Sequence, residues 1–188
     1  MKKLLLYSML LMGCMSAGVL TSCGSDGDSD GGGSSDGSTG KSNGVITLSD
    51  KTIGVSYGFF HKQSSQRWYL EFYNYDLLHG TKPSVINGLV IGLKTKDAFD
   101  QIPTGEFTNF SVDIIEGQLA DSEDSGNEYE GEAGDSPNSK LTITRNSDGS
   151  YTISYDSMDL YGEDSKQPAM SNTSFTFTGT LEEMEDYS

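Results

Sequence analysis

Cysteine is nearly absent from this chain. The two cysteines among the 188 residues are Cys14 and Cys23, so both lie near the N-terminus and the rest of the sequence has none. Without a thiol, residues 24–188 can form no disulfide, no cysteine nucleophile and no cysteine-ligated metal centre. Any fold beyond Cys23 therefore depends on the burial of apolar side chains.

Imidazoles and positive charges are also few. The only histidines are His61 and His79, and a Ser–His–Asp site needs a base within hydrogen-bonding distance of its nucleophile. No spacing in the sequence indicates such a site, so we predict no catalytic residues. The sequence has 12 Lys and Arg and 28 Asp and Glu, which gives a formal net charge of -16. So acidic a chain repels phosphates and anionic headgroups, which argues against nucleic-acid binding.

The first 22 residues combine a positive start with an apolar stretch. Lys2 and Lys3 carry the charge, and the residues from Leu4 to Leu20 are almost all apolar. This pattern is typical of a secretory leader, and with Cys23 after it the segment resembles the signal peptide of bacterial lipoproteins. The resemblance implies that residues 1–22 are removed, that the sulfur of Cys23 is acylated, and that the lipid chains attach the protein to a membrane.

Two alternatives stay open for this segment. Cys14 follows a similar but shorter apolar run, although the residues after it stay apolar as far as Leu20. A retained transmembrane helix would need about 20 predominantly apolar residues. The residues that interrupt the apolar stretch are Gly13, Ser16, Gly18, Thr21 and Ser22.

Residues 23–44 change abruptly to Gly, Ser and Asp after the cysteine. A chain of this composition cannot build a core, so we expect a flexible tether that begins at lipidated Cys23. The acidic residues directly after Cys23 resemble the export signal of Bacteroidetes surface lipoproteins. That resemblance implies a lipid-anchored protein of the outer membrane, exposed at the cell surface, with the membrane as a partner through the lipid anchor.

Residues 45–182 carry the pattern of one all-β domain, and residues 183–188 form an acidic tail. Apolar and polar residues alternate with a period of two through most of the domain, which predicts strands. The clearest hairpin joins Leu141–Arg145 to Tyr151–Tyr155 through a turn that contains Asp-Gly,. Consecutive antiparallel strands with turn-rich links predict an antiparallel β-sandwich of about eight strands, and the alternative is an eight-stranded lipocalin-like barrel.

Three further runs predict individual strands. The alternation from Ile53 to Phe59 and that from Phe175 to Leu181 each indicate a single strand. The run from Val85 to Leu93 has apolar residues on both faces, so we expect a central strand that is buried on both sides.

The segment 121–139 holds seven carboxylates and no basic residue. Its first twelve residues match the spacing of an EF-hand calcium loop, with Gly126 at the sharp turn. The candidate calcium ligands are Asp121, Glu123, Ser125 and Glu132. Glu replaces the usual Asp or Asn at the third position, and Glu128 stands where an apolar residue normally packs. The alternative is a solvated acidic loop, and calcium is the one cofactor that the sequence suggests.

The run Arg67–Tyr75 is rich in aromatic residues. We expect Trp68 and Phe72 to face the core and the tyrosines to line the opposite face. Flat amphipathic rings beside hydrogen-bonding groups suit a sugar or a partner protein, although tyrosine is also an ordinary strand former. The candidate ligand-binding residues are Trp68, Tyr69, Tyr73 and Tyr75.

One modification site is suggested by a short motif. Asp156-Ser157-Met158 resembles the O-glycosylation signal of exported Bacteroidetes proteins. The resemblance implies Ser157 as the acceptor, provided that its hydroxyl is exposed.

Three functions stay open on the sequence. The first, which we favour, is a lipid-anchored surface domain that binds a glycan or a protein without catalysis. The second is a structural or shielding lipoprotein with no specific ligand. The third is an envelope hydrolase, which would need a converging pair of carboxylates or a Ser–His pair.

Overall fold

The computed structural model describes residues 43–122, 125–162, 165 and 167–184. Twelve strands and no helix occur among these residues. In chain order the strands are β1 (Gly44–Thr47), β2 (Thr52–Val55), β3 (Tyr57–Ser64), β4 (Arg67–Tyr73), β5 (Val85–Lys94), β6 (Gly105–Phe107), β7 (Phe110–Leu119), β8 (Asn127–Glu132), β9 (Leu141–Arg145), β10 (Tyr151–Gly162), β11 (Met170–Gly179) and β12 (Leu181–Glu183). The predicted all-β class is confirmed, whereas the strands outnumber the predicted eight.

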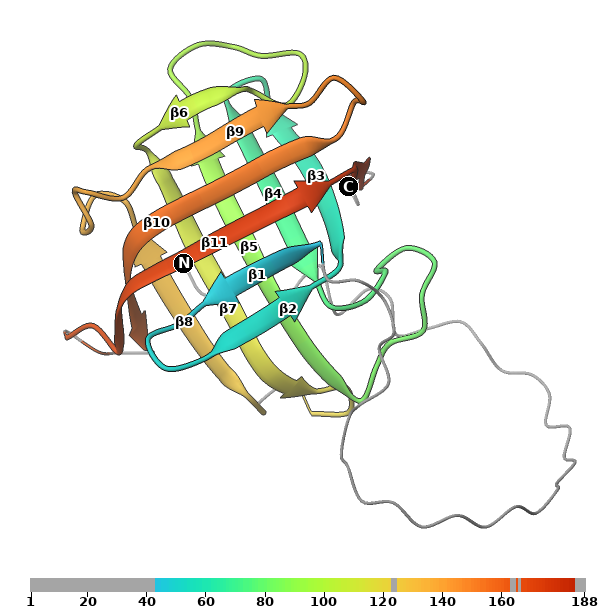
Figure 1. Ribbon diagram of the computed structural model, residues 1–188, viewed down its shortest axis with the longest axis vertical. Helices are drawn as coiled ribbons and strands as arrows, with labels where there is room; N and C mark the ends of the chain where they lie inside the picture. The colour runs from blue at the N-terminus through green and yellow to red at the C-terminus, as the bar shows by residue number, and fades with distance from the viewer. Residues whose placement is uncertain (1–42, 123–124, 163–164, 166, 185–188) are drawn as a thin grey trace, which may run out of the picture. The chain divides into compact units, whose positions relative to one another are not determined.

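The strands form one hydrogen-bonded sheet that folds over into two layers (Figure 1). In the layer that we call sheet A the strand order is β6-β9-β10-β11-β1-β2. In sheet B the order is β12-β3-β4-β5-β7-β8. Neighbouring strands are antiparallel except β12, which is parallel to β3. Figure 1 shows the strands of sheet A crossing in front of those of sheet B.

The strand β10 belongs to both layers. Its first half pairs with β9 and β11 in sheet A, and its last residues, Tyr161 and Gly162, pair with β8 in sheet B. The ladder to β11 shifts register between Tyr155 and Met158, and Ser157 between them has a φ of 54°. A bulge of this kind bends a strand and increases its twist, so it allows β10 to turn the corner between the sheets.

The two runs that were predicted as single strands, Ile53–Phe59 and Phe175–Leu181, are each divided between the sheets. Ser56 separates β2 from β3, and its backbone N–H donates to the carbonyl of Tyr73 in sheet B at 2.9 Å. Thr180 separates β11 from β12 in the same way. These predictions were wrong because alternation reports which face a residue occupies and does not report which neighbour its strand pairs with.

Apolar side chains from both sheets fill the space between the layers. Trp68 and Phe72 of β4 are 1% and 0% exposed, which confirms the expectation that they face the core. The ring of Phe72 packs against Phe175 and Phe177 of sheet A, with centroids 4.7 and 4.8 Å apart. Rings of this size contribute a large share of the buried apolar area, so these contacts join the two layers.

The strand β5 is central, as predicted. It pairs with β4 on one side and with β7 on the other. Leu89, Ile91 and Leu93 belong to the core between the sheets. Ile86 and Val90 are also buried, at 0% and 6% exposed.

The hairpin predicted around Asp148-Gly149 is confirmed. Arg145 pairs with Tyr151, and the N–H of Asn146 donates to the carbonyl of Ser150 at 2.8 Å. Gly149 has a φ of +87°, a conformation that costs glycine little because it has no Cβ,. This hairpin brings Arg145 and Tyr151 to one end of the space between the sheets.

Candidate functional site

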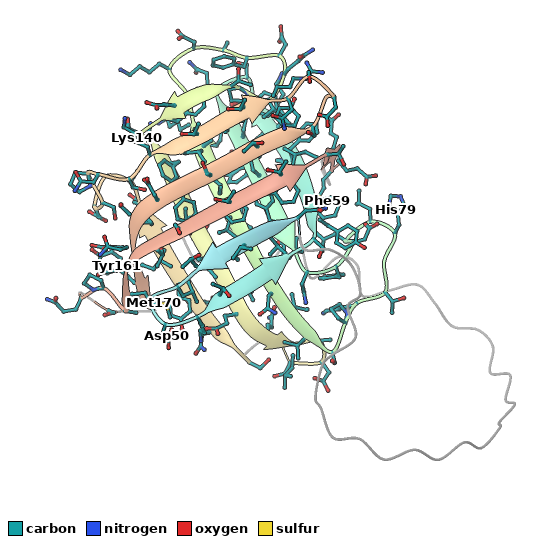
Figure 2. All side chains as sticks on the ribbon, viewed as in Figure 1. Asp50, Phe59, His79, Lys140, Tyr161 and Met170 are labelled. Carbon is teal, nitrogen blue, oxygen red and sulfur yellow. The ribbon has the colours of Figure 1, made fainter. Side chains whose placement is uncertain are left out.

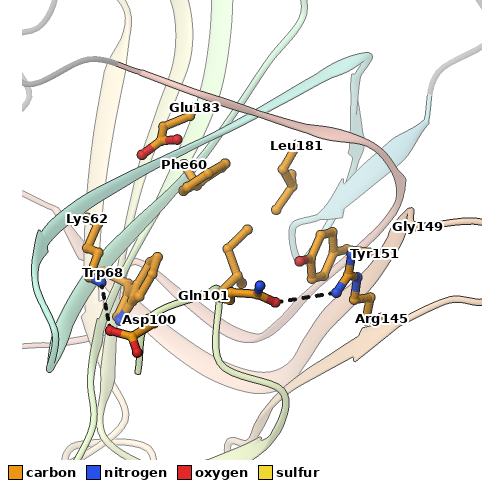
Figure 3. Close-up of a pocket in the computed structure, with 11 residues that line it drawn as sticks. Phe60, Lys62, Trp68, Asp100, Gln101, Arg145, Gly149, Tyr151, Leu181 and Glu183 are labelled. Atoms are coloured by element: carbon orange, nitrogen blue, oxygen red, sulfur yellow. Dashed lines mark hydrogen bonds and ion pairs between the residues drawn. The ribbon is translucent and has the colours of Figure 1, made fainter. Parts of the chain in front are cut away.

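A hollow of about 300 Å³ opens between the two sheets at this end (Figure 3). Its volume lies at the lower end of the range for small-molecule sites. The lining comes from β3, β4, β12, the β5–β6 connection and the β9–β10 hairpin. The lining residues are Phe60, Lys62, Trp68, Asp100, Gln101, Ile102, Arg145, Gly149, Tyr151, Leu181 and Glu183.

Aromatic and apolar side chains form the inner part of this hollow. The rings of Phe60 and Trp68 lie with their centroids 6.4 Å apart, and Tyr151 and Leu181 are half-buried beside the opening. Trp68 is 1% exposed, and its indole Nε1 is buried with no hydrogen-bond partner. A buried N–H without a partner is rare in folded proteins and costs about 1–3 kcal/mol. Because this N–H is fully buried, it reports how tightly Trp68 is packed and is not itself a contact point for a ligand.

Charged groups lie at the rim, with both signs present. The ammonium of Lys62 lies 3.8 Å from Asp100 Oδ1 and 5.1 Å from the ring centre of Trp68. Arg145 Nη1 donates to Gln101 Oε1 at 3.4 Å. Both contacts are long for charge-assisted interactions, so these donors can turn toward a ligand.

The net charge of the rim differs from that of the whole chain. Lys62 and Arg145 balance Asp100 and Glu183 around the hollow, whereas the chain has a net charge of -16. The hollow therefore presents donors and acceptors in similar numbers, an arrangement that suits a polar, uncharged ligand.

Trp68 is the one residue of this hollow that was predicted from the sequence to bind a ligand. Phe60, Arg145 and Tyr151 each fit an ordinary strand or hairpin pattern, and no local signal marks them as site residues. They come together because two hairpins from different sheets meet, and this depends on the tertiary arrangement. The composition offers one signal, because Arg145 is one of only two arginines in an acidic chain.

The four predicted ligand-binding residues do not form one surface. Trp68 faces the hollow, whereas Tyr69 lies on the outer face of sheet B with its ring centre 6.0 Å from that of His61. His61 lies in β3, the neighbour of β4 in sheet B. Tyr75 is half-buried and meets the ring of Tyr73 edge to face at 6.1 Å.

Tyr73 is 0% exposed, so it is not the accessible platform that was expected. Its ring lies over Gly88 of β5, where a Cβ would come within 2.5 Å of the ring atoms. Its hydroxyl donates to Glu71 Oε2 at 2.9 Å. Burial raises the pKa of the Glu71 carboxyl, and the hydrogen bond from Tyr73 opposes that shift. Because Gly88 has no side chain, the ring of Tyr73 can pack against β5 at this position and is buried there.

The acidic segment 121–139 is not a single loop. The strand β8 occupies Asn127–Glu132, with Glu132 opposite Ser111 of β7, so the closing position of the expected calcium loop lies in a strand. Ser125 Oγ donates to the carbonyl of Ser122 at 2.6 Å and accepts from the N–H of Leu119 at 2.7 Å.

Asp121 is exposed, and Glu123 lies outside the described residues. The three described members of the predicted ligand set, Asp121, Ser125 and Glu132, therefore do not form the wrapped loop of an EF-hand. The alternation within β8 was hidden because its residues are nearly all polar or acidic.

Ser157 lies at the corner of β10, where its φ is 54° and its side chain is half-buried. Its neighbour Asp156 is exposed, and the carbonyl of Asp156 accepts the hydroxyl of Ser139 at 2.6 Å. Glycosylation of Ser157 stays a prediction.

The leader, Cys23 and the tether up to residue 42 lie outside the described residues. Within the described part of the chain, no helix has the length and apolar character needed to cross a membrane.

A scan against protein-family models finds no match, and neither a curated protein nor a solved structure matches this chain. A functional assignment therefore depends on the sequence of the N-terminal segment and on the geometry of the hollow.

Proposed function

We propose that the chain is a lipid-anchored lipoprotein of the cell envelope, displayed at the outer surface, and that its β domain binds a glycan without catalysis. The observation that carries the binding function is the hollow between the sheets, with aromatic and apolar side chains in its inner part and groups of both charges at its rim (Figure 3). The two facing layers support a β-sandwich as the architecture, in preference to a closed barrel,.

A sugar ring fits the chemistry of this hollow. Its C–H faces can pack on the half-buried rings of Phe60 and Tyr151, and its hydroxyl groups both donate and accept hydrogen bonds. Lys62 and Arg145 would donate to ring and hydroxyl oxygens, while Asp100 and Glu183 would accept from hydroxyl groups,. A protein ligand would need a larger surface than this hollow provides.

Trp68 is the one tryptophan of the chain, so tryptophan fluorescence reports on the surroundings of this residue. The full-length chain, purified in mild detergent, is first screened against a glycan array. A glycan that binds on the array should then change the emission of Trp68 when it is titrated into the protein. Tyr151→Ala and Arg145→Gln should each weaken binding about tenfold, because each removes about 1.4 kcal/mol of contact.

Tyr57→Ala is the matched control, because Tyr57 is 43% exposed and does not line the hollow. No response to any glycan would overturn the proposal, and capture of a protein by the same preparation would then favour a protein ligand. Equal weakening by the Tyr57 variant would also contradict the assignment to this site.

The anchor is tested separately from the binding site. In a bacterial host that processes lipoproteins, the full-length protein should lose residues 1–22 and gain acyl mass at Cys23. Cys23→Ser should abolish both changes, whereas Cys14→Ser should leave them intact. Intact-mass spectrometry of the membrane fraction checks this, and protease treatment of whole cells checks exposure at the surface. Acylation at Cys14, or none, would contradict the proposal.

A further inference from the structure

The connection between β4 and β5 turns tightly at Asp76. Asp76 Oδ1 accepts the backbone N–H groups of Leu78 and His79, each at 3.0 Å, and the N–H of Gly80 donates to the carbonyl of Asp76 at 3.0 Å. A Cβ at residue 80 would lie 2.6 Å from that carbonyl, so the turn needs glycine there. These bonds fix the carboxylate of Asp76 and leave Oδ2 directed toward His79.

The imidazole of His79 lies between two carboxylates that are far apart in the sequence. Its Nδ1 is 3.5 Å from Asp76 Oδ2, and its Nε2 is 3.9 Å from Glu182 Oε1. Glu182 belongs to β12, where it pairs with Phe59 of β3. Figure 2 shows His79 on the outer side of the molecule, on the same side as Phe59. The three side chains therefore converge from two separate segments of the domain.

No Lys or Arg forms an ion pair with Asp76 or Glu182 among the described residues. Two carboxylates that are held near each other repel unless a positive group lies between them. Among the described residues, His79 is the side chain that the structure places between these two carboxylates.

A nitrogen of His79 and one carboxylate oxygen of each acid lie within 4.8 Å of one another. Zinc binds His nitrogen and Asp or Glu oxygen at about 2.0–2.2 Å in a tetrahedral arrangement, which places its ligands about 3.4 Å apart. The side chains of His79 and Glu182 are 67% and 52% exposed, so they can rotate to bring both carboxylates to one imidazole nitrogen and to shorten the longest ligand separation by about 1.4 Å,.

The ligand types favour zinc over the harder cations. Calcium takes six to eight oxygen ligands and magnesium an octahedral oxygen set, whereas an imidazole ligand suits zinc, which also accepts carboxylate oxygen and with three protein ligands keeps one position for water. We propose that Asp76, His79 and Glu182 form a Zn²⁺ site that joins the β4–β5 turn to the C-terminal strand β12. This site is separate from the hollow and does not depend on the proposed glycan.

The test is calorimetric titration of Zn²⁺ into the full-length chain, without a polyhistidine tag and after removal of metals by a chelator. We expect one binding event that His79→Ala weakens at least tenfold and that Glu182→Gln also weakens. His61→Ala is the matched control, because it removes the other imidazole of the chain and should leave the affinity unchanged. Parallel titrations with Ca²⁺ and Mg²⁺ measure the general attraction of the acidic surface for cations.

Equal zinc affinities of the wild type and the His79 variant would overturn the proposal, as would loss of binding in the His61 variant. Co²⁺ provides a second measurement on the wild type alone. Visible absorption typical of four-coordinate Co²⁺ that zinc displaces would support the site, and its absence would contradict it.

Discussion

Asp113 lies on the outer face of sheet B, opposite Glu130 of β8. Burial raises the pKa of its carboxyl to about 6, and the negative charges of Glu130, Glu128 and Glu132 add to the shift. Like charges that face each other across a ladder destabilise a sheet. The ionised form of Asp113 is therefore disfavoured in the folded state.

This shift has a defined effect on stability. Because the folded pKa is above that of the unfolded chain, the native state binds the extra proton between about pH 4 and pH 6, and the free energy of unfolding falls as the pH rises through that window. We expect Asp113→Asn to raise the free energy of unfolding at pH 7.5 by about 1–3 kcal/mol and to have little effect at pH 4. Urea unfolding at both pH values, followed by circular dichroism, measures the difference.

Asp135→Asn serves as the control for this experiment, because Asp135 is exposed in the turn after β8. It should change the free energy of unfolding by less than about 0.5 kcal/mol at either pH. A pH profile of the Asp113 variant parallel to that of the wild type would show that this carboxyl is not the titrating group.

At the scale of single residues, the sequence predicts burial well where strands alternate. Trp68 and Phe72 face the core as expected, and Leu70 between them is also buried, because one face of β4 is apolar. Tyr73 was assigned to the accessible face because nothing in its own strand indicates burial. The reason lies in β5, where Gly88 leaves room for the ring, and the pairing of these two strands is not local information.

Elements defined by their own turn chemistry are the ones that the sequence predicts. The β9–β10 hairpin is such a case, because its turn residues and the paired parts of both strands lie within 15 residues (141–155). The corners at Ser56 and Thr180 were missed, because a change of pairing partner depends on residues far away in the chain. The strand β8 was missed because pairing with β7 overrides the low strand propensity of its acidic residues,.

The junction of β8 with the corner of β10 depends on Gly131. A Cβ at this position would lie 2.7 Å from the carbonyl oxygen of Asp159 and 2.9 Å from Leu160 Cδ2. Since a backbone atom cannot move aside as a side chain can, we expect Gly131→Ala to lower the free energy of unfolding by about 1–3 kcal/mol. Urea unfolding monitored by Trp68 fluorescence provides the measurement.

Gly134→Ala is the matched control in the turn that follows β8. A Cβ there would have no neighbour within 4 Å, so the same substitution should change the free energy of unfolding by at most about 1 kcal/mol, in the stabilising direction. If both alanine variants are equally stable, β8 and the corner of β10 do not pack as closely as described.

At the scale of the whole molecule, β12 connects the hollow with the proposed zinc site. Successive side chains of a strand point to opposite faces. Leu181 and Glu183 line the hollow, whereas Glu182 between them approaches His79. The strand has only three residues, and its one partner among the described strands is β3. Such a short edge strand opens at a low free-energy cost, so an ion that holds Glu182 would also hold the wall of the hollow.

Zinc should therefore slow hydrogen exchange in β12 and strengthen binding in the hollow. The N–H of Met184 donates to the carbonyl of Phe60 at 2.8 Å, and we expect saturating Zn²⁺ to slow the exchange of amides 181–184 at least tenfold in the full-length chain, as measured by mass spectrometry. Glu182→Gln should remove this protection, while the β9–β10 hairpin should exchange at the same rate with and without zinc. By linkage, any gain in glycan affinity with zinc must equal the gain in zinc affinity with glycan, so affinities that each stay unchanged when the other ligand is bound would show that the two sites are not coupled through β12.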